Sequence, residues 1–166
     1  LAPSFRAEKS RTRRHLTEFW HAEVESAWLH NHQMMALEEG MMMHIISSVL
    51  SKNKAELEFL GRDISVLENI KAPFDKMKYE EVLDKLNSLG FDLVWGDDFG
   101  YKEEKALTQD LKSPLYITNF PREKGFYHRP DPSDPKSLVC HDLLAPEGYG
   151  EIIGGGEREN DLDILT

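Results

Sequence analysis

The stretch FRAEKSRTRRHLTEFWHAEVE, residues 5–25, places a run of basic residues directly before aromatic and acidic ones. We predict two strands here, residues 4–8 and 17–25, joined by a charged turn. The second strand alternates with a period of two, which is the pattern of a strand with two different faces. One of its faces carries Thr17, Phe19, His21, Glu23 and Glu25. A polar, acidic face inside a sheet is typical of a strand that lines a cleft.

The overall composition limits the class of protein. A chain of 166 residues is long enough for one domain with a hydrophobic core. Its formal net charge of −10 opposes unspecific coating of nucleic acid, although a locally basic loop can still bind a defined phosphate. Cys140 is the only cysteine, which excludes an intrachain disulfide and predicts a reducing, cytoplasmic location. We expect no membrane segment, because no apolar run reaches eighteen residues.

The middle of the chain reads as helical. Apolar residues recur at helical spacing through residues 31–52, which predicts one helix with a broad buried stripe. The stripe contains Met34, Leu37, Met41, Ile45 and Val49, with Met42, Ile46 and Leu50 alongside. Residues 54–69 predict a second amphipathic helix. Residues 79–89 predict a third, ended by Gly90. We expect residues 92–110, which are polar and contain glycines, to pack loosely.

Strands return toward the end of the chain. Residues 115–120, 126–128, 138–144 and 149–153 read as strands, while residues 129–137 contain three prolines and predict an exposed loop. Strands at both ends with helices between them indicate an α+β fold, built on an antiparallel sheet flanked by helices.

The basic turn is the first group of residues that could carry chemistry. Arg6, in a strand, can bind phosphate with two parallel hydrogen bonds. Glu8 faces the same way and can accept from an amino group, while Phe19 on the returning strand could stack on a base. Together they would make a nucleotide site without a glycine-rich loop. A solvated charged hairpin with no ligand is an equally good reading of the residues alone.

The second group lies in HDLLAPEGYGEIIGGGERE, residues 141–159. Asp142 and Glu151 fall on neighbouring predicted strands and could share a hard cation. Arg158 follows three glycines, which allow a close approach of backbone or ligand. The alternative is that Arg158 only forms surface ion pairs with Glu157 and Glu159, which contribute little.

In this order and at this separation, the two groups resemble class II aminoacyl-tRNA synthetases of the aspartate/asparagine subgroup. Residues 5–25 look like the second signature motif of that family, and FPREKGFY (residues 120–127) and DLLAPEGYGEIIGGGERE (142–159) look like its later strands. The asparagine-specific branch resembles the chain most. The resemblance implies ATP- and Mg²⁺-dependent activation of asparagine as an aminoacyl-adenylate, transfer to the acceptor end of tRNA, and a homodimer.

The resemblance also implies a role for individual residues in the nucleotide site. Arg6 would bind the α-phosphate of ATP and the amino acid carboxylate, and would be the catalytic residue. The adenine ring would contact Glu8 through its amino group and Phe19 through stacking, and His15 would meet the outer phosphates. The tRNA acceptor end would approach Arg11 and Arg13.

For the amino acid, the resemblance implies that Glu23 accepts from a nitrogen and Arg158 donates to the side-chain oxygen, with Tyr127 lining the pocket. Asp142 and Glu151 would hold Mg²⁺. The family usually has Ser-Gln where this chain has Gly156 and Glu157. We expect Glu157 to add negative charge beside Arg158, and so to favour the amide of asparagine over the carboxylate of aspartate.

These implications make residues 1–166 the central part of one catalytic domain, with residues 53–112 as a helical segment that is less typical of the family. We expect the first and third signature motifs to lie outside these residues, and the isolated fragment to be inactive. Two alternatives stay open. One is a related enzyme that activates aspartate and passes the adenylate to ammonia to make free asparagine. The other is a non-catalytic module that binds a nucleotide or a partner.

Overall fold

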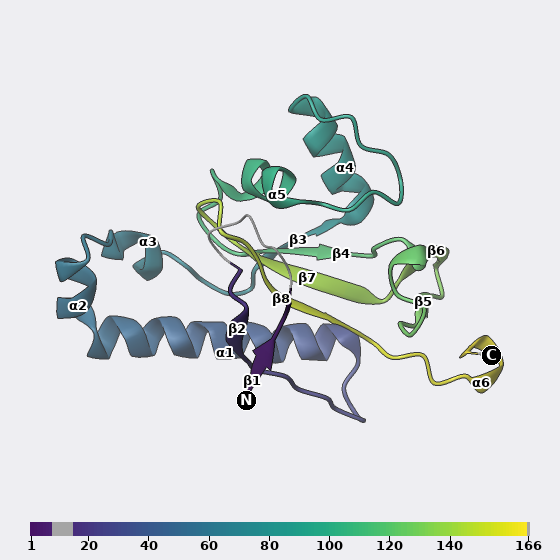
Figure 1. Cartoon of the computed structure of the whole chain (residues 1–166), viewed down its shortest axis with the longest axis horizontal. Helices are drawn as coiled ribbons and strands as arrows, with labels where there is room; N and C mark the ends of the chain where they lie inside the picture. The colour runs from purple at the N-terminus through teal and green to yellow at the C-terminus, as the bar shows by residue number, and fades with distance from the viewer. Residues whose placement is uncertain (8–14, 166) are drawn as a thin grey trace.

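The computed structural model describes residues 1–7 and 15–165 (Figure 1). Three residues with predicted roles, Glu8, Arg11 and Arg13, lie outside the described residues. The helices and strands are, in chain order, β1 (Ala2–Phe5), β2 (Glu18–His21), α1 (Asn31–Lys52), α2 (Lys54–Phe59), α3 (Ile64–Glu68), β3 (Asp75–Lys78), α4 (Tyr79–Ser88), α5 (Tyr101–Thr108), β4 (Leu115–Thr118), the 3₁₀ helix η1 (Arg122–Lys124), β5 (Pro130–Asp131), β6 (Asp134–Leu138), β7 (Cys140–Ala145), β8 (Gly150–Gly156) and α6 (Leu162–Leu165).

The central sheet has four strands in the order β3-β4-β7-β8. The pairs β4–β7 and β7–β8 are antiparallel, but β3 runs parallel to β4. The fold is α+β as predicted, and the predicted antiparallel sheet is found in β4, β7 and β8, to which β3 adds a parallel strand at the edge. Strand β3 was not predicted, because its four residues, DKMK, are mostly charged. Parallel neighbours need a long crossover, which α4 and α5 provide.

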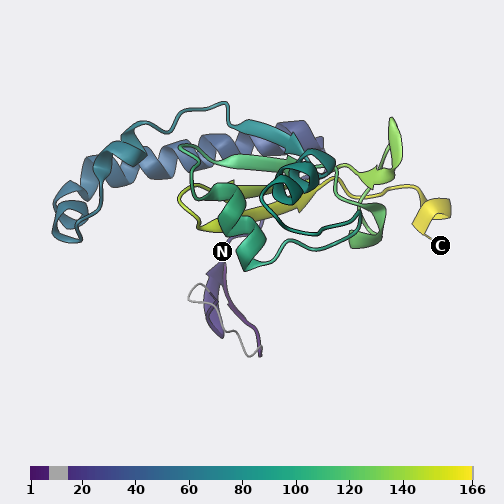
Figure 2. The ribbon, with the colours of Figure 1, turned by 90° about the horizontal axis from the view of Figure 1, so that it is seen from above.

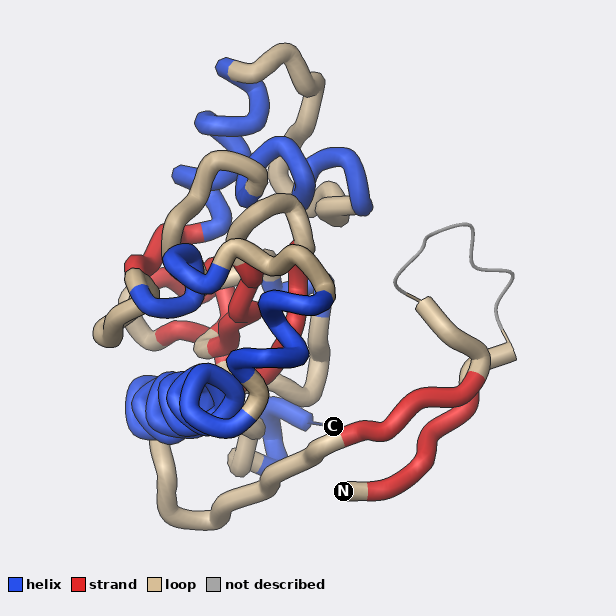
Figure 3. Tube along the Cα trace, turned by 90° about the vertical axis from the view of Figure 1, so that its left-hand side faces the viewer, coloured by secondary structure: helices blue, strands red, loops and turns tan. Residues whose placement is uncertain are grey.

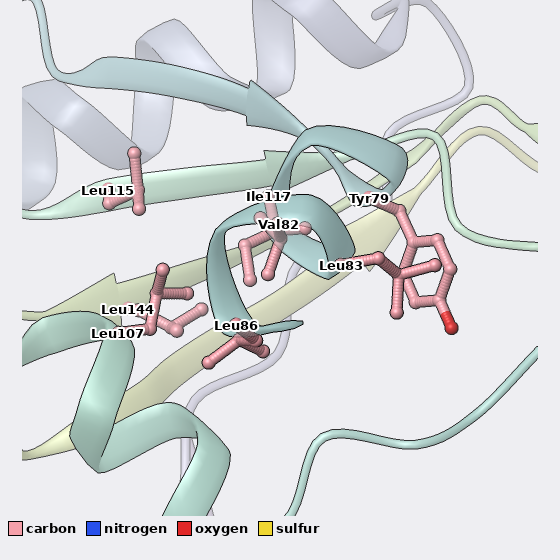
Figure 4. Close-up of a cluster of buried hydrophobic side chains, with 8 residues drawn as sticks. All are labelled: Tyr79, Val82, Leu83, Leu86, Leu107, Leu115, Ile117 and Leu144. Carbon is pink, nitrogen blue, oxygen red and sulfur yellow. The ribbon is translucent and has the colours of Figure 1, made fainter. Parts of the chain in front are cut away.

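Helices cover both faces of the central sheet. Figures 1 and 2 show α1 along one face and α4 with α5 over the other. Neighbouring residues of a strand point to opposite faces, so Leu115 and Ile117 of β4 pack toward α4 while Tyr116 packs toward α1. The cluster on the α4 side contains Tyr79, Val82, Leu83, Leu86, Leu107, Leu115, Ile117 and Leu144 (Figure 4). Complete burial of one such side chain stabilises the fold by about 1.5–3 kcal/mol.

Helix α1 spans Asn31–Lys52, which are the predicted bounds. At its start the His30 N–H donates to Gln33 Oε1 at 2.9 Å. The predicted buried stripe is confirmed at Ile46, which is buried, but is wrong at Leu37 and Ile45, which are 50% and 45% exposed. Met35, which was not in the predicted stripe, is buried. The helix therefore uses a face rotated from the predicted one to contact the sheet.

Two other helical predictions need correction. The helix predicted over residues 54–69 is split into α2 and α3 at Gly61, whose φ of 69° is left-handed. The carboxylate of Asp63 then accepts from the Ser65 N–H at 3.0 Å and starts α3. Residues 92–110 do not pack loosely, because they contain α5, where Leu107 is buried. The third predicted helix is confirmed as α4, followed by Gly90 with a φ of 94°.

The last third of the chain differs from prediction in two short segments. Residues 126–128 form a turn after η1 instead of a strand, and only His128 makes an isolated antiparallel bridge, to Arg158. The predicted loop 129–137 contains the short hairpin β5–β6. Prolines suppress the strand signal here, although they are tolerated at the edge of a sheet.

The first two strands form a separate hairpin. Strands β1 and β2 are antiparallel, with Ser4 opposite Phe19, and within the described residues they pair only with each other. Figures 2 and 3 show this hairpin projecting from the remainder of the structure. Strand β2 ends at His21, so Glu23 and Glu25 lie beyond it and not within the predicted longer strand.

Candidate active site

The hairpin brings Arg6 and Phe19 to one face. The Arg6 N–H donates to the carbonyl of Thr17 at 2.9 Å, and Ser4 lies opposite Phe19. Opposed residues of an antiparallel pair face the same side, and so do residues two apart on a strand. Arg6 is exposed and lies one residue beyond the end of β1, not within a strand as predicted, and Phe19 of β2 is half-buried. His15, the other described residue of this segment with a predicted role in nucleotide binding, is exposed.

Asp142 and Glu151 lie on neighbouring strands with their carboxylates turned to one place. Asp142, on β7, is opposite Gly154 of β8. A Cβ built on Gly154 would lie 3.2 Å from Asp142 Oδ1 and 3.0 Å from Glu151 Oε1. Only a glycine leaves both carboxylates this room. The structure therefore brings the two predicted metal ligands together.

A third carboxylate, Glu104 from α5, joins this pair and was missed in the sequence. Its Oε2 accepts the Glu151 N–H at 3.1 Å. Burial raises the pKa of Asp142 to about 8, and the charges of Glu151 and Glu104 add to the effect. Carboxylate oxygens are the ligands that Mg²⁺ prefers, so this donor set fits a hard divalent cation. The described residues contain no group of three His, Cys, Asp or Glu side chains that could hold a metal ion by themselves.

Arg158 follows β8 and faces an acidic residue from the segment after β2. Its Nη2 is 2.5 Å and its Nε 3.2 Å from Glu25 Oε1. The guanidinium also lies over the ring of Tyr127, 4.9 Å from its centroid. Tyr127 is thus beside Arg158 as expected. Glu23 Oε1 lies 3.6 Å from His21 Nδ1. Sequence analysis assigned no role to Glu25. The one pattern that pointed to it was the alternation with a period of two, which put Glu25 on the same predicted strand face as Glu23.

Glu157 lies on the opposite side of the strand from Arg158. Its Oε1 accepts from Arg129 Nη1 at 2.7 Å, and its Oε2 accepts from the Asn31 N–H at 3.2 Å. Burial opposes ionisation of Glu157, but these hydrogen bonds and a contact with His30 outweigh it and hold its pKa below the usual range. The expectation that Glu157 adds negative charge beside Arg158 is therefore wrong, because adjacent strand residues point to opposite faces.

Each glycine of the 154–156 run makes room for a different neighbour. Gly154 accommodates the two carboxylates. A Cβ on Gly155 would lie 2.9 Å from His141 Cε1, and one on Gly156 would lie 2.5 Å from His128 Nδ1. The packing of side chains around β8 therefore explains the three consecutive glycines. The predicted close approach of a ligand to them stays a prediction.

The residue beneath Gly155, His141, belongs to a buried polar network that sequence analysis did not identify. His141 Nε2 is 2.9 Å from Glu38 Oε2, and its Nδ1 is 2.8 Å from Asn31 Oδ1. The Tyr116 hydroxyl donates to the Met35 carbonyl at 2.9 Å and also contacts Glu38 at 3.2 Å. Burial, with the charge of Glu38, raises the pKa of Tyr116. This network connects α1 to β7, the strand that carries Asp142, and lies next to β8, the strand that precedes Arg158.

No helix in residues 1–7 and 15–165 combines the length and the apolar character needed to cross a membrane.

Comparison with known proteins places the whole chain in one family. Residues 1–166 match the family described as tRNA synthetases class II (D, K and N). The chain is 52% identical over 166 residues to an asparagine--tRNA ligase of Thermoplasma acidophilum, covering 99% of this chain and 39% of that protein. The chain thus spans about two fifths of the length of the curated relatives it matches.

Solved structures agree with this assignment. The crystal structure of asparaginyl-tRNA synthetase from Pyrococcus horikoshii complexed with asparaginyl-adenylate superposes with a TM-score of 0.94 at 47% identity, covering 99% of this chain and 38% of that one. The aspartyl-tRNA synthetase of Entamoeba histolytica superposes with a TM-score of 0.76 at 28% identity, covering 98% of this chain and 35% of that one. The chain therefore belongs to the class II tRNA synthetases of the D, K and N group.

Proposed function

We propose that residues 1–166 are the central part of the catalytic domain of an asparagine--tRNA ligase, a cytoplasmic enzyme that acts as a homodimer. The enzyme would use ATP and Mg²⁺ to activate asparagine as asparaginyl-adenylate and would then transfer it to tRNA. The observation that supports this best is the placement of Arg158 beyond the Asp142–Glu151 pair, on a fold that superposes with TM-score 0.94 on a synthetase complexed with asparaginyl-adenylate.

In the first step, a carboxylate oxygen of asparagine attacks the α-phosphorus of ATP, and the bond to the β-phosphate breaks to release pyrophosphate. The protein needs no covalent nucleophile for this, since positioning and charge stabilisation suffice. Arg6 would bind the α-phosphate and the attacking carboxylate. Phe19 would stack on the adenine, as the shared hairpin face allows, while Glu8 would accept from the adenine amino group and His15 would meet the outer phosphates.

In the second step, a terminal hydroxyl of tRNA attacks the carbonyl carbon of the adenylate, and AMP leaves. Arg11 and Arg13 would bind the acceptor end through its phosphates, because guanidinium groups form paired hydrogen bonds with phosphate oxygens.

Asp142 and Glu151 would hold Mg²⁺. The ion, when bound, neutralises charge on the phosphates. The two carboxylates supply oxygen ligands from neighbouring strands, and the Glu151 N–H held by Glu104 fixes the strand at that point.

The side-chain amide of asparagine would be recognised by the guanidinium of Arg158 together with nearby carboxylates. Arg158 would donate to the amide oxygen, while Glu23 would accept from a nitrogen of the amino acid. Glu25, which holds Arg158 at 2.5 Å, adds a second carboxylate to this place. Aspartate would bring a further carboxylate, and like charges about 4 Å apart cost about 4 kcal/mol at an effective dielectric constant near 20. We therefore propose selection of asparagine over aspartate.

The experiment is pyrophosphate exchange by the full-length protein with asparagine and with aspartate, followed by charging of tRNA. Asparagine should give a kcat/KM at least about a hundredfold higher, the ratio that an energy difference of about 3 kcal/mol produces. A preference for aspartate, with free asparagine formed from ammonia, would support the amidating enzyme instead. Failure of the full-length protein to bind any adenylate analogue would support a non-catalytic module.

A further inference from the structure

His128 is held between two glycines, next to the strand that leads to Arg158. A Cβ on Gly125 would lie 2.7 Å from His128 Cδ2. A Cβ on Gly156 would lie 2.5 Å from His128 Nδ1 and 2.6 Å from its Cε1. A side chain at either glycine would overlap the ring, so the imidazole occupies space that both positions leave open.

The backbone places this ring on the same side as Arg158. His128 is opposite Arg158 in an antiparallel bridge. On either side of it, the Arg129 N–H donates to the Glu157 carbonyl at 2.8 Å, and the Glu159 N–H donates to the Tyr127 carbonyl at 2.9 Å. Opposed residues of such a pair face the same way.

A chain of contacts leads from the ring to the guanidinium. The rings of His128 and Tyr127 have centroids 4.5 Å apart. The Arg158 guanidinium lies 4.9 Å above the Tyr127 ring. A shift of His128 would therefore move Tyr127, and with it the surface on which Arg158 rests.

The contacts of His128 indicate that its role is to fill space. Its Nδ1 is buried and makes no hydrogen bond to any described residue. A buried polar atom without a partner lowers stability, so this nitrogen is not placed there to gain a hydrogen bond. Burial lowers the pKa of His128, with the charge of Arg158 adding to that effect and a backbone hydrogen bond with Glu157 opposing it.

We propose that His128 is a positioning residue for Arg158: its imidazole, fitted between Gly125 and Gly156, fixes the Tyr127 ring under the guanidinium that reads the asparagine side chain. The proposal rests on the proposed role of Arg158. It extends that role by assigning a residue that need not touch the amino acid.

The test uses the full-length enzyme and measures the Kd of asparagine by calorimetry, the KM values for asparagine and ATP in pyrophosphate exchange, and the Tm. His128→Ala should raise the Kd and KM of asparagine about tenfold, as expected for a misplaced binding group, with the KM of ATP unchanged. His128→Leu fills a similar volume without ring nitrogens and should restore most of the affinity for asparagine.

A second substitution tests the fit itself. Gly125 has an extended backbone, with φ of −162°, which any residue can adopt. Gly125→Ala should therefore act only through the ring, raising the KM of asparagine when His128 is present but adding no further loss to His128→Ala. The matched control is Gly40→Ala in α1, where a Cβ meets nothing within 4 Å and the KM should not change.

The outcomes separate the two proposals. A wild-type enzyme that exchanges with asparagine, combined with a His128→Ala variant of unchanged KM, overturns the positioning role alone. A variant that loses Tm and raises the KM of ATP and asparagine equally shows a merely structural residue and also overturns it. A wild-type enzyme inactive with asparagine overturns the proposed function together with this inference.

Discussion

At the scale of single residues, the chemistry depends on a few charged groups with sharply different surroundings. Arg6 is exposed on a hairpin, whereas Asp142 sits among two other carboxylates with its pKa raised to about 8. A buried carboxylate with acidic neighbours prefers a proton or a cation. The two halves of the proposed site therefore differ: the carboxylates around Asp142 need a proton or a cation to balance their charge, whereas Arg6 on the hairpin does not.

Arg6→Ala in the full-length enzyme should lower asparagine-dependent pyrophosphate exchange by about 10²–10³-fold, because it removes a donor to charge that develops in the transition state. Exchange rates at saturating ATP measure this effect. Lys54→Ala, an exposed change at the start of α2, serves as the control and should leave the rate unchanged. Near-normal exchange in the Arg6 variant would contradict the assignment of this residue.

Asp142 makes the stability of the metal-free protein depend on pH. Its folded pKa of about 8 lies above the unfolded value of 3.8, so the folded state binds this proton more tightly between those pH values. Stability contributed by the proton is complete below pH 3.8 and is lost as pH rises through about 8. Denaturation with a chelator present should show this decline, and Asp142→Asn should reduce it. An unchanged pH profile in the variant would show that another group titrates.

Glu151→Gln tests the proposed ligand pair. The substitution keeps the size of the side chain but removes a charged ligand, so Mg²⁺-dependent ATP binding should weaken much more than the Tm falls. Calorimetry with and without Mg²⁺, together with thermal unfolding, compares the two. Equal losses of binding and stability would indicate a carboxylate that serves only the fold.

At the scale of elements, the position of the site is set by how α1 and the glycine run pack on β7. The fully buried His141 joins α1 to β7 through Glu38 and Asn31, and Gly155 lies directly against its ring. Removing one partner of a buried hydrogen bond leaves the other unsatisfied, at a cost of about 1–3 kcal/mol. Strand β8, which precedes Arg158, is therefore held in place by His141, Glu38 and Asn31, which take no part in the proposed chemistry.

Glu38→Ala should accordingly destabilise the domain by about 1–3 kcal/mol, because it leaves the buried Nε2 of His141 without its hydrogen-bond partner, while the Tyr116 hydroxyl still donates to the Met35 carbonyl. The exposed His44→Ala on the same helix is the matched control and should change stability by at most about 0.5 kcal/mol. Denaturant unfolding of both variants measures the difference. Similar midpoints would show that the network does not stabilise α1 on the sheet.

At the scale of the whole molecule, the described residues 1–7 and 15–165 expose several large apolar side chains. Trp28 and Phe59 are 88% and 91% exposed, and the apolar face of α1 containing Leu37 and Ile45 is also uncovered. Apolar patches of this kind favour association. The span of about two fifths of the related synthetases is consistent with this exposure.

Residues 1–166 expressed alone should therefore self-associate and form no adenylate. Light scattering and pyrophosphate exchange test the two properties separately, with the full-length protein as the positive control. A monomeric fragment that exchanges pyrophosphate would show that these residues hold a complete active site.

The sequence by itself determined the features that depend on local spacing. The bounds of α1, the glycine stop after α4 and the strand pair that joins Asp142 to Glu151 all follow from periodicity or from adjacent strands. Only the tertiary structure decided which side chains meet across long distances in the chain. It paired Arg158 with Glu25, turned Glu157 toward Arg129 and Asn31, and added β3 in parallel. The reason is physical: local patterns fix the conformation of an element, but its neighbours are selected by packing and charge pairing between segments whose separation no local pattern records.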